Sequence, residues 1–112
     1  MKTRVLDLIG NETTDVVTLT ERAAEAAQRQ MAERGFPRGS GIRVDVFGRH
    51  RPRRYEITYD DVPATEGREW IGQSHGVTIL VSKKDTPRLM GLIIDFQDGR
   101  YTFDESELIW AD

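Results

Sequence analysis

Residues 20–35, TERAAEAAQRQMAERG, contain the start, body and end of one helix. Thr20 suits the N-cap, because its hydroxyl can accept a hydrogen bond from an unpaired backbone N–H of the first turn. Gly35 suits the left-handed position that ends many helices. Good helix formers fill the interval, and three residues follow the spacing of one buried face, namely Ala24, Ala27 and Met31. We therefore predict a helix over residues 21–34 whose alanine-rich face packs closely against a sheet.

The chain beyond this helix consists of short runs in which apolar and polar residues alternate, the pattern of half-buried strands. We predict strands over residues 42–47, 55–59, 69–71, 77–81, 92–96 and 100–103. The third and fourth of these are joined by a predicted turn, Ser74-His75-Gly76. Thr86-Pro87 opens a predicted helical turn over residues 86–90, because proline is tolerated in the first turn of a helix. Asp98-Gly99 favours a hairpin between the last two strands.

The composition indicates one soluble domain. The chain has 112 residues, of which 38% are hydrophobic and 31% are charged, and this length suits a single core. No apolar run approaches the roughly 20 residues that cross a bilayer, and the first ten residues lack the apolar stretch of a signal peptide, so we expect a cytoplasmic protein that does not enter a membrane. The absence of cysteine excludes disulfides, thiolate metal sites and cysteine nucleophiles.

Five phrases of the sequence resemble, in the same order, segments of the HesB/IscA family of A-type iron-sulfur carriers. They are VTLTERAA (17–24), GIRVDV (41–46), GVTILV (76–81), GLIIDF (91–96) and GRYTF (99–103). The resemblance implies an α+β fold, with a mixed, mostly antiparallel β-sheet or flattened barrel and one main helix. It divides the chain into an N-terminal extension (1–15), which is either an edge strand or mobile, a HesB/IscA-like domain (16–104) and an acidic C-terminal tail (105–112).

The departures from the family concern its ligands. The family's first cysteine lies in a glycine-rich loop that corresponds here to residues 48–54, with His50 or Arg51 nearest the cysteine position. The family's Cys-x-Cys pair lies beyond the segment that ends here at Phe103. The residues that follow Phe103 in this chain include no cysteine. Clusters need soft sulfur ligands. The resemblance therefore implies the fold, and we expect no cysteine-ligated cluster and no other cofactor.

The loop between the first two predicted strands is the candidate binding site. Its basic side chains are Arg49, His50, Arg51, Arg53 and Arg54. Arginine forks match carboxylates and phosphates. We expect the loop first of all to pair with the acidic C-terminal tail of the same chain; an acidic protein or a small anion as the partner is the alternative. Nucleic acid is disfavoured, because the net charge of the chain is −3 and the loop has no interleaved aromatic residue. Trp110, in the tail, either folds back onto the sheet or offers an apolar anchor to a binding partner.

Other candidates are weaker. His50 is a metal candidate because imidazole binds iron and zinc, but the surrounding arginines repel a cation. His75 is interpreted as a turn residue. Two acidic groups, Asp60 with Asp61 and Asp104 with Glu105 and Glu107, lack the spacing of a calcium loop and are interpreted as solvated.

These patterns favour a non-enzymatic binding or regulatory protein. The first alternative is a carrier of iron or another metal in iron-sulfur cluster assembly that uses histidine and carboxylate ligands. The second is a small enzyme, although no Ser-His-Asp set, phosphate-binding loop or zinc motif is visible in the sequence.

Overall fold

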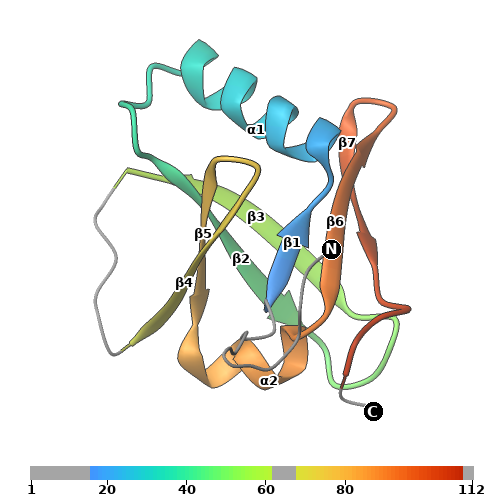
Figure 1. The fold of residues 1–112 in the computed structure, drawn as a ribbon. Helices are drawn as coiled ribbons and strands as arrows, with labels where there is room; N and C mark the ends of the chain where they lie inside the picture. Colours follow the sequence, from blue (N-terminus) through green and yellow to red (C-terminus); the bar gives the residue numbers. More distant parts are fainter. Residues whose placement is uncertain (1–15, 62–67, 110–112) are drawn as a thin grey trace, which may run out of the picture.

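The computed structural model describes residues 16–61 and 68–109 (Figure 1). The elements follow one another as β1 (Val17–Leu19), α1 (Glu21–Glu33), β2 (Gly41–Phe47), β3 (Arg54–Asp60), β4 (Glu69–Ser74), β5 (Val77–Ser82), a 3₁₀ turn η1 (Lys83–Asp85), α2 (Thr86–Leu89), β6 (Leu92–Gln97) and β7 (Arg100–Asp104). Every helix and strand that the sequence predicts after residue 20 is present. The segment that could form an edge strand within residues 1–15 lies outside the described residues, as does Trp110.

The strands form two sheets. One contains three strands in the order β1-β6-β7, and the other contains four in the order β3-β2-β5-β4. Two pairs are parallel, β1 with β6 and β2 with β5, and the remaining pairs are antiparallel. The α+β class is confirmed. The expected flattened barrel is not closed, because no ladder of backbone hydrogen bonds joins the two sheets in the described part of the chain.

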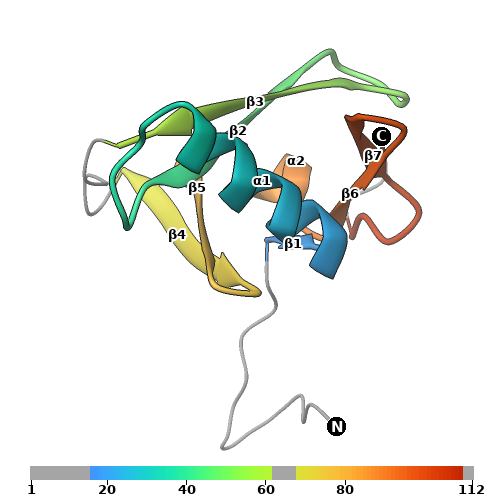
Figure 2. The same cartoon turned by 90° about the horizontal axis from the view of Figure 1, so that it is seen from above.

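Helix α1 covers the space between the two sheets (Figure 2). Its N-cap is Thr20, whose Oγ1 accepts from the backbone N–H of Ala23 at 3.2 Å. The face toward the sheets is made of alanines and Met31, all buried, and small side chains allow the close packing that the sequence predicts. The helix ends one residue before the predicted boundary, and Gly35 takes the left-handed conformation with φ of +79°.

Strand β1 was not among the predicted elements. Its three residues pair in parallel with β6, with Val17 opposite Leu92.

Strand β4 continues to Ser74, which was predicted to lie in a turn. The turn itself is made by His75 and Gly76, both with positive φ. Ser74 Oγ accepts from the N–H of Leu19 at 2.9 Å and donates to the Leu19 carbonyl at 3.2 Å. This hydroxyl therefore links β4 to β1 where the sheets are not paired.

Aromatic side chains join the two sheets on the opposite side. The ring of Tyr55 on β3 stacks on that of Phe103 on β7, with centroids 5.0 Å apart. Further along the same strands, the hydroxyls of Tyr59 and Tyr101 lie 2.9 Å apart. Burial and this hydrogen bond raise the pKa of the Tyr101 phenol. Side chains, rather than backbone hydrogen bonds, thus hold β3 next to β7.

The segment after β7 folds back against the start of β6. Leu108 packs on the core, and the N–H of Ile109 donates to the carbonyl of Met90 at 3.0 Å. Gly91 has φ of +100°, and a Cβ at this position would clash with the carbonyl oxygen of Glu107. Glycine is therefore required here by both conformation and space.

Asp95 on β6 connects the three-stranded sheet to the start of α1. Its carboxylate accepts from the hydroxyl of Thr20 at 2.6 Å and from the guanidinium of Arg22 at 2.6 and 2.7 Å. It also accepts from the N–H of Phe96 at 2.8 Å. These donors, the Arg22 guanidinium first, hold the pKa of Asp95 well below its ordinary value. The carboxylate therefore stabilises the helix start in its charged form.

We predict that Asp95→Asn lowers stability at pH 7 and that its effect shrinks on acidification. A carboxylate with a depressed pKa stabilises the fold above the pKa of the unfolded chain, near 4, and loses this contribution as the pH falls. Urea unfolding of both proteins at pH 7 and pH 3 measures the effect. The control is Glu25→Gln, at an exposed position of α1. An equal deficit at both pH values would contradict the prediction.

Candidate functional site at the arginine-rich loop

Residues 48–53 connect β2 to β3 and form, with Arg54, the arginine-rich loop. Gly48 begins it with φ of +104°. Arg49, His50, Arg51 and Arg54 are exposed, and Arg53 is half-buried. The loop that the sequence predicts between its first two strands is therefore present.

Glu105 lies at the centre of the contacts that hold this loop. One carboxylate oxygen accepts both from the backbone N–H of Arg53, at 3.0 Å, and from the hydroxyl of Tyr55. The Glu105 carbonyl accepts from Arg51 Nη1 at 3.5 Å. Burial, followed by the hydrogen bond to Glu105, raises the pKa of the Tyr55 phenol, which therefore stays a proton donor. The loop thus pairs with the first residue of the C-terminal segment.

Arg88 on α2 supports the other side of the loop. One of its Nη atoms donates to the carbonyl of Gly48, and the other lies 3.6 Å from the buried carboxylate of Asp85. The carbonyl of Arg88 in turn accepts from Arg53 Nη1 at 3.2 Å. Arg88 is thus joined to the loop by two hydrogen bonds, one to Gly48 and one from Arg53, and it places a fifth arginine at the edge of the loop.

An open hollow adjoins the loop. It has a volume of about 550 Å³ and is lined by Val46, Phe47, Gly48, Arg49 and Arg88. Phe47 is 40% exposed, and the guanidinium of Arg54 lies over its ring at 4.8 Å from the centroid. We call Phe47, Arg49, Arg54 and Arg88 the arginine face. It combines an exposed aromatic ring with several cations, and none of its four members is acidic.

The remaining predicted site residues lie elsewhere. Asp60 accepts from Arg43 Nε and Nη2 at 3.1 and 2.9 Å, and Arg43 also binds Glu69, so Asp60 belongs to an ion-pair network at the strand ends. His75 is exposed in the β4–β5 turn. Among the described residues, no three histidine, aspartate or glutamate side chains are grouped to hold a metal ion.

Sequence reasoning missed the roles of Glu105, Tyr55 and Arg88. Tyr55 was assigned to a strand face, and Glu105 to a group of solvated carboxylates. Each lies at least 30 residues from one of its partners, since Tyr55 and Glu105 are separated by 50 residues and Arg88 and Gly48 by 40. Short-range sequence patterns cannot predict contacts between residues that are this far apart in the chain.

Comparison with known proteins identifies the fold. No family model matches the chain, and no curated protein matches it by sequence. Among solved structures, SufA from Escherichia coli, described as involved in the biosynthesis of iron-sulfur clusters, is 18% identical with a TM-score of 0.59, covering 84% of this chain and 87% of SufA. IscA with a [2Fe-2S] cluster is 22% identical with a TM-score of 0.54, covering 78% of each chain. This chain has the fold of SufA and IscA. The resemblance inferred from the sequence is confirmed at the level of the fold.

This fold brings together the two segments that the family resemblance associates with cysteine. The loop at residues 48–54 and the segment after Phe103 meet through Glu105 and Arg53. The chain has no cysteine, and the carboxylate at this junction is already hydrogen-bonded to the protein. These residues do not fit a thiolate-ligated cluster. Within the described residues, no helix is both long enough and apolar enough to cross a membrane.

We predict an energetic coupling between Tyr55 and Glu105. Hydrogen bonds to a charged group contribute about 1.5–3 kcal/mol, so Glu105→Gln and Tyr55→Phe should each destabilise the protein by about 1 kcal/mol or more. The double variant should cost less than the sum of the two. Urea unfolding of the four proteins gives the coupling free energy. Strict additivity would show that the Tyr55–Glu105 contact does not stabilise the fold.

Proposed function

We propose that this chain is a non-enzymatic binding or regulatory protein that uses the fold of SufA and IscA without holding a cysteine-ligated cluster. The observation that carries the proposal is the junction of Arg53, Tyr55 and Glu105, where the family resemblance leads us to expect thiolates. A single carboxylate that already accepts two hydrogen bonds from the protein, beside a loop rich in arginine, is a poor ligand set for a soft cationic cluster. The arginine side chains of the neighbouring loop favour anions.

The partner that we propose is an acidic protein surface at the arginine face. Arginine and aromatic residues are enriched at the energetic centres of protein interfaces, and both occur here. Phe47 supplies an apolar contact, while Arg49 and Arg54 supply cations on either side of the loop. The stacking of Arg54 on Phe47 and the hydrogen bond from Arg88 to Gly48 orient two of these guanidinium groups before any partner arrives.

A small anion is the second candidate for this face. The hollow lined by Arg49 and Arg88 favours it, because two guanidinium groups border one open space. The cations extend beyond this hollow to Arg54, however, and a small anion would leave the exposed ring of Phe47 uncovered. A protein partner would cover both, and we therefore rank it first.

We predict that the protein binds a ten-residue polyglutamate peptide and that Arg49→Glu with Arg54→Glu weakens binding by about tenfold or more. Both side chains are exposed, so the fold should tolerate the change. Fluorescence anisotropy of the labelled peptide measures affinity, and added salt should weaken it because salt screens exposed charges.

The matched control is Arg29→Glu with Arg100→Glu, which changes the net charge equally on exposed positions of α1 and β7. The control should bind as the unchanged protein does. Equal losses in both variants would mean that net charge, rather than the arginine face, attracts the peptide. Competition by inorganic phosphate at constant ionic strength would favour the small anion instead.

We also predict that purified protein incubated anaerobically with iron and sulfide stays colourless after desalting. No thiolate is present to retain a cluster. Visible absorbance and bound iron are measured, with SufA treated in parallel as a positive control. A brown product with stoichiometric iron would contradict the proposal and support a carrier that uses histidine and carboxylate ligands.

A further inference from the structure

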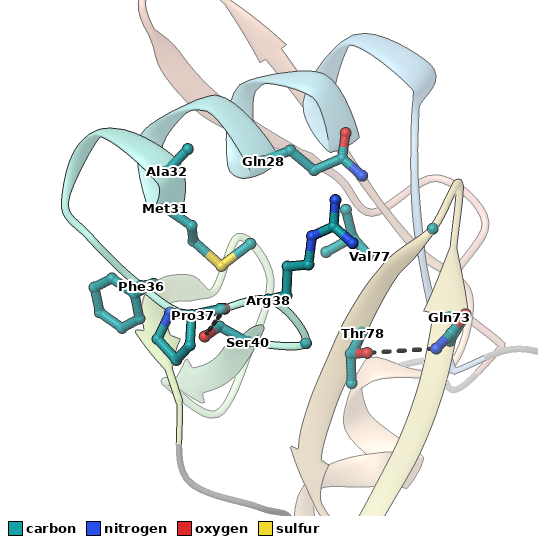
Figure 3. Close-up of a pocket in the computed structure, with 12 residues that line it drawn as sticks. Gln28, Met31, Ala32, Phe36, Pro37, Arg38, Ser40, Gln73, Val77 and Thr78 are labelled. Atoms are coloured by element: carbon teal, nitrogen blue, oxygen red, sulfur yellow. Dashed lines mark hydrogen bonds between the residues drawn. The ribbon is translucent and has the colours of Figure 1, made fainter.

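A second cavity lies at the other end of β2 from the arginine face. It has a volume of about 340 Å³ and separates the last turns of α1 from the β4–β5 hairpin (Figure 3). This volume falls at the lower end of the roughly 300–1,000 Å³ found for small-molecule sites. Residues 36–40, the connection from α1 to β2, close its lower side. None of its lining residues takes part in the arginine face.

The floor of this cavity is apolar. Met31 and Val77 are 7% and 2% exposed, and both belong to the core. Phe36 and Pro37 extend this apolar lining toward solvent. An apolar floor below a polar rim is the usual construction of a small-molecule site, because burial supplies affinity and the few polar groups fix orientation.

The rim presents hydrogen-bond donors. The guanidinium of Arg38 and the side-chain amide of Gln28 point toward each other across the opening (Figure 3). Gln28 Nε2 faces inward, since it lies 3.5 Å from where a Cβ would stand on Gly76. In the described part of the chain, neither side chain has a hydrogen bond or ion pair with another residue. Arg38 has donors only, and Gln28 turns its Nε2 donor inward, so an acceptor placed between them would bind both in this arrangement.

The charge of the cavity also favours an anion. Arg38 is the only charged side chain among the described residues that line it. The carbonyls at the end of α1 do not compete, because Met31 O accepts from the N–H of Phe36 at 2.9 Å and Ala32 O accepts from that of Gly35 at 3.1 Å. Thr78 Oγ1 accepts from Gln73 Nε2 at 3.4 Å, which leaves the hydroxyl proton of Thr78 available as a third donor.

We propose that this cavity binds a small organic carboxylate with an apolar body. The carboxylate would accept from Arg38 and Gln28, for which a planar guanidinium is well suited, and the body would lie over Met31 and Val77. Inorganic anions have no apolar body to contact Met31 and Val77 at the floor of the cavity. A neutral apolar compound would leave the two donors without an acceptor. The site is independent of the proposed function, because the two groups of residues lie at opposite ends of β2.

The test is an NMR titration of the ¹⁵N-labelled protein with sodium octanoate. Saturable shifts are expected at residues 28–40 and 73–78. Arg38→Gln should weaken binding by about tenfold or more, because it removes a charge-assisted hydrogen bond. The matched control is Arg100→Gln, an identical change at an exposed position outside the cavity, which should leave the affinity unchanged.

Two further measurements separate the parts of the proposal. Octanamide keeps the apolar body and lacks the charge, so it should bind at least about tenfold more weakly. Ala32→Leu introduces a larger helix-forming side chain at the rim and should reduce octanoate binding. Shifts that fail to saturate, that centre on residues 49–54, or that persist unchanged in Arg38→Gln would overturn the proposal. Equal affinity for octanamide, or unaltered binding in Ala32→Leu, would do the same.

Discussion

One shared apolar core is the constraint on which this structure depends. In the described part of the chain, no ladder of backbone hydrogen bonds joins the two small sheets, so burial of their inner faces must hold them together. Ile42 and Ile79 from one sheet, and Leu92 and Ile94 from the other, are fully buried. The alanines of α1 let the helix lie close over both sheets. The Ser74 hydroxyl and the aromatic contacts between β3 and β7 then fix the two open sides.

This arrangement also determines where function can reside. In this chain, which has the fold of SufA and IscA, the β2–β3 loop meets the segment after β7. The meeting point is the carboxylate of Glu105, which accepts from the backbone N–H of Arg53 and the hydroxyl of Tyr55. This fold is therefore compatible with quite different chemistry, because a fold sets positions while the side chains at those positions set the activity. The two proposed sites use opposite ends of the same strand, and the binding of one ligand does not require the other.

Local periodicity accounts for most of the predicted fold. The helix after Thr20, the strands with alternating side chains and the Asp98-Gly99 hairpin are found within a few residues of the expected positions, because each depends on neighbours in sequence. Strand β1 was missed because three residues are too few to show a period. Ser74 was placed in a turn because its composition suits one, whereas its hydroxyl binds Leu19, 55 residues away.

The sequence by itself determined the class of fold, the resemblance to A-type carriers, the absence of thiolate chemistry and the concentration of arginine in one loop. These properties are encoded in residue identity and short-range spacing. Only the tertiary structure decided that the sheets remain separate, that Glu105 holds the loop through Arg53 and Tyr55, and that Arg38 and Gln28 face each other over an apolar floor. Such contacts join residues far apart in the chain, and their formation depends on how the core packs rather than on any local pattern.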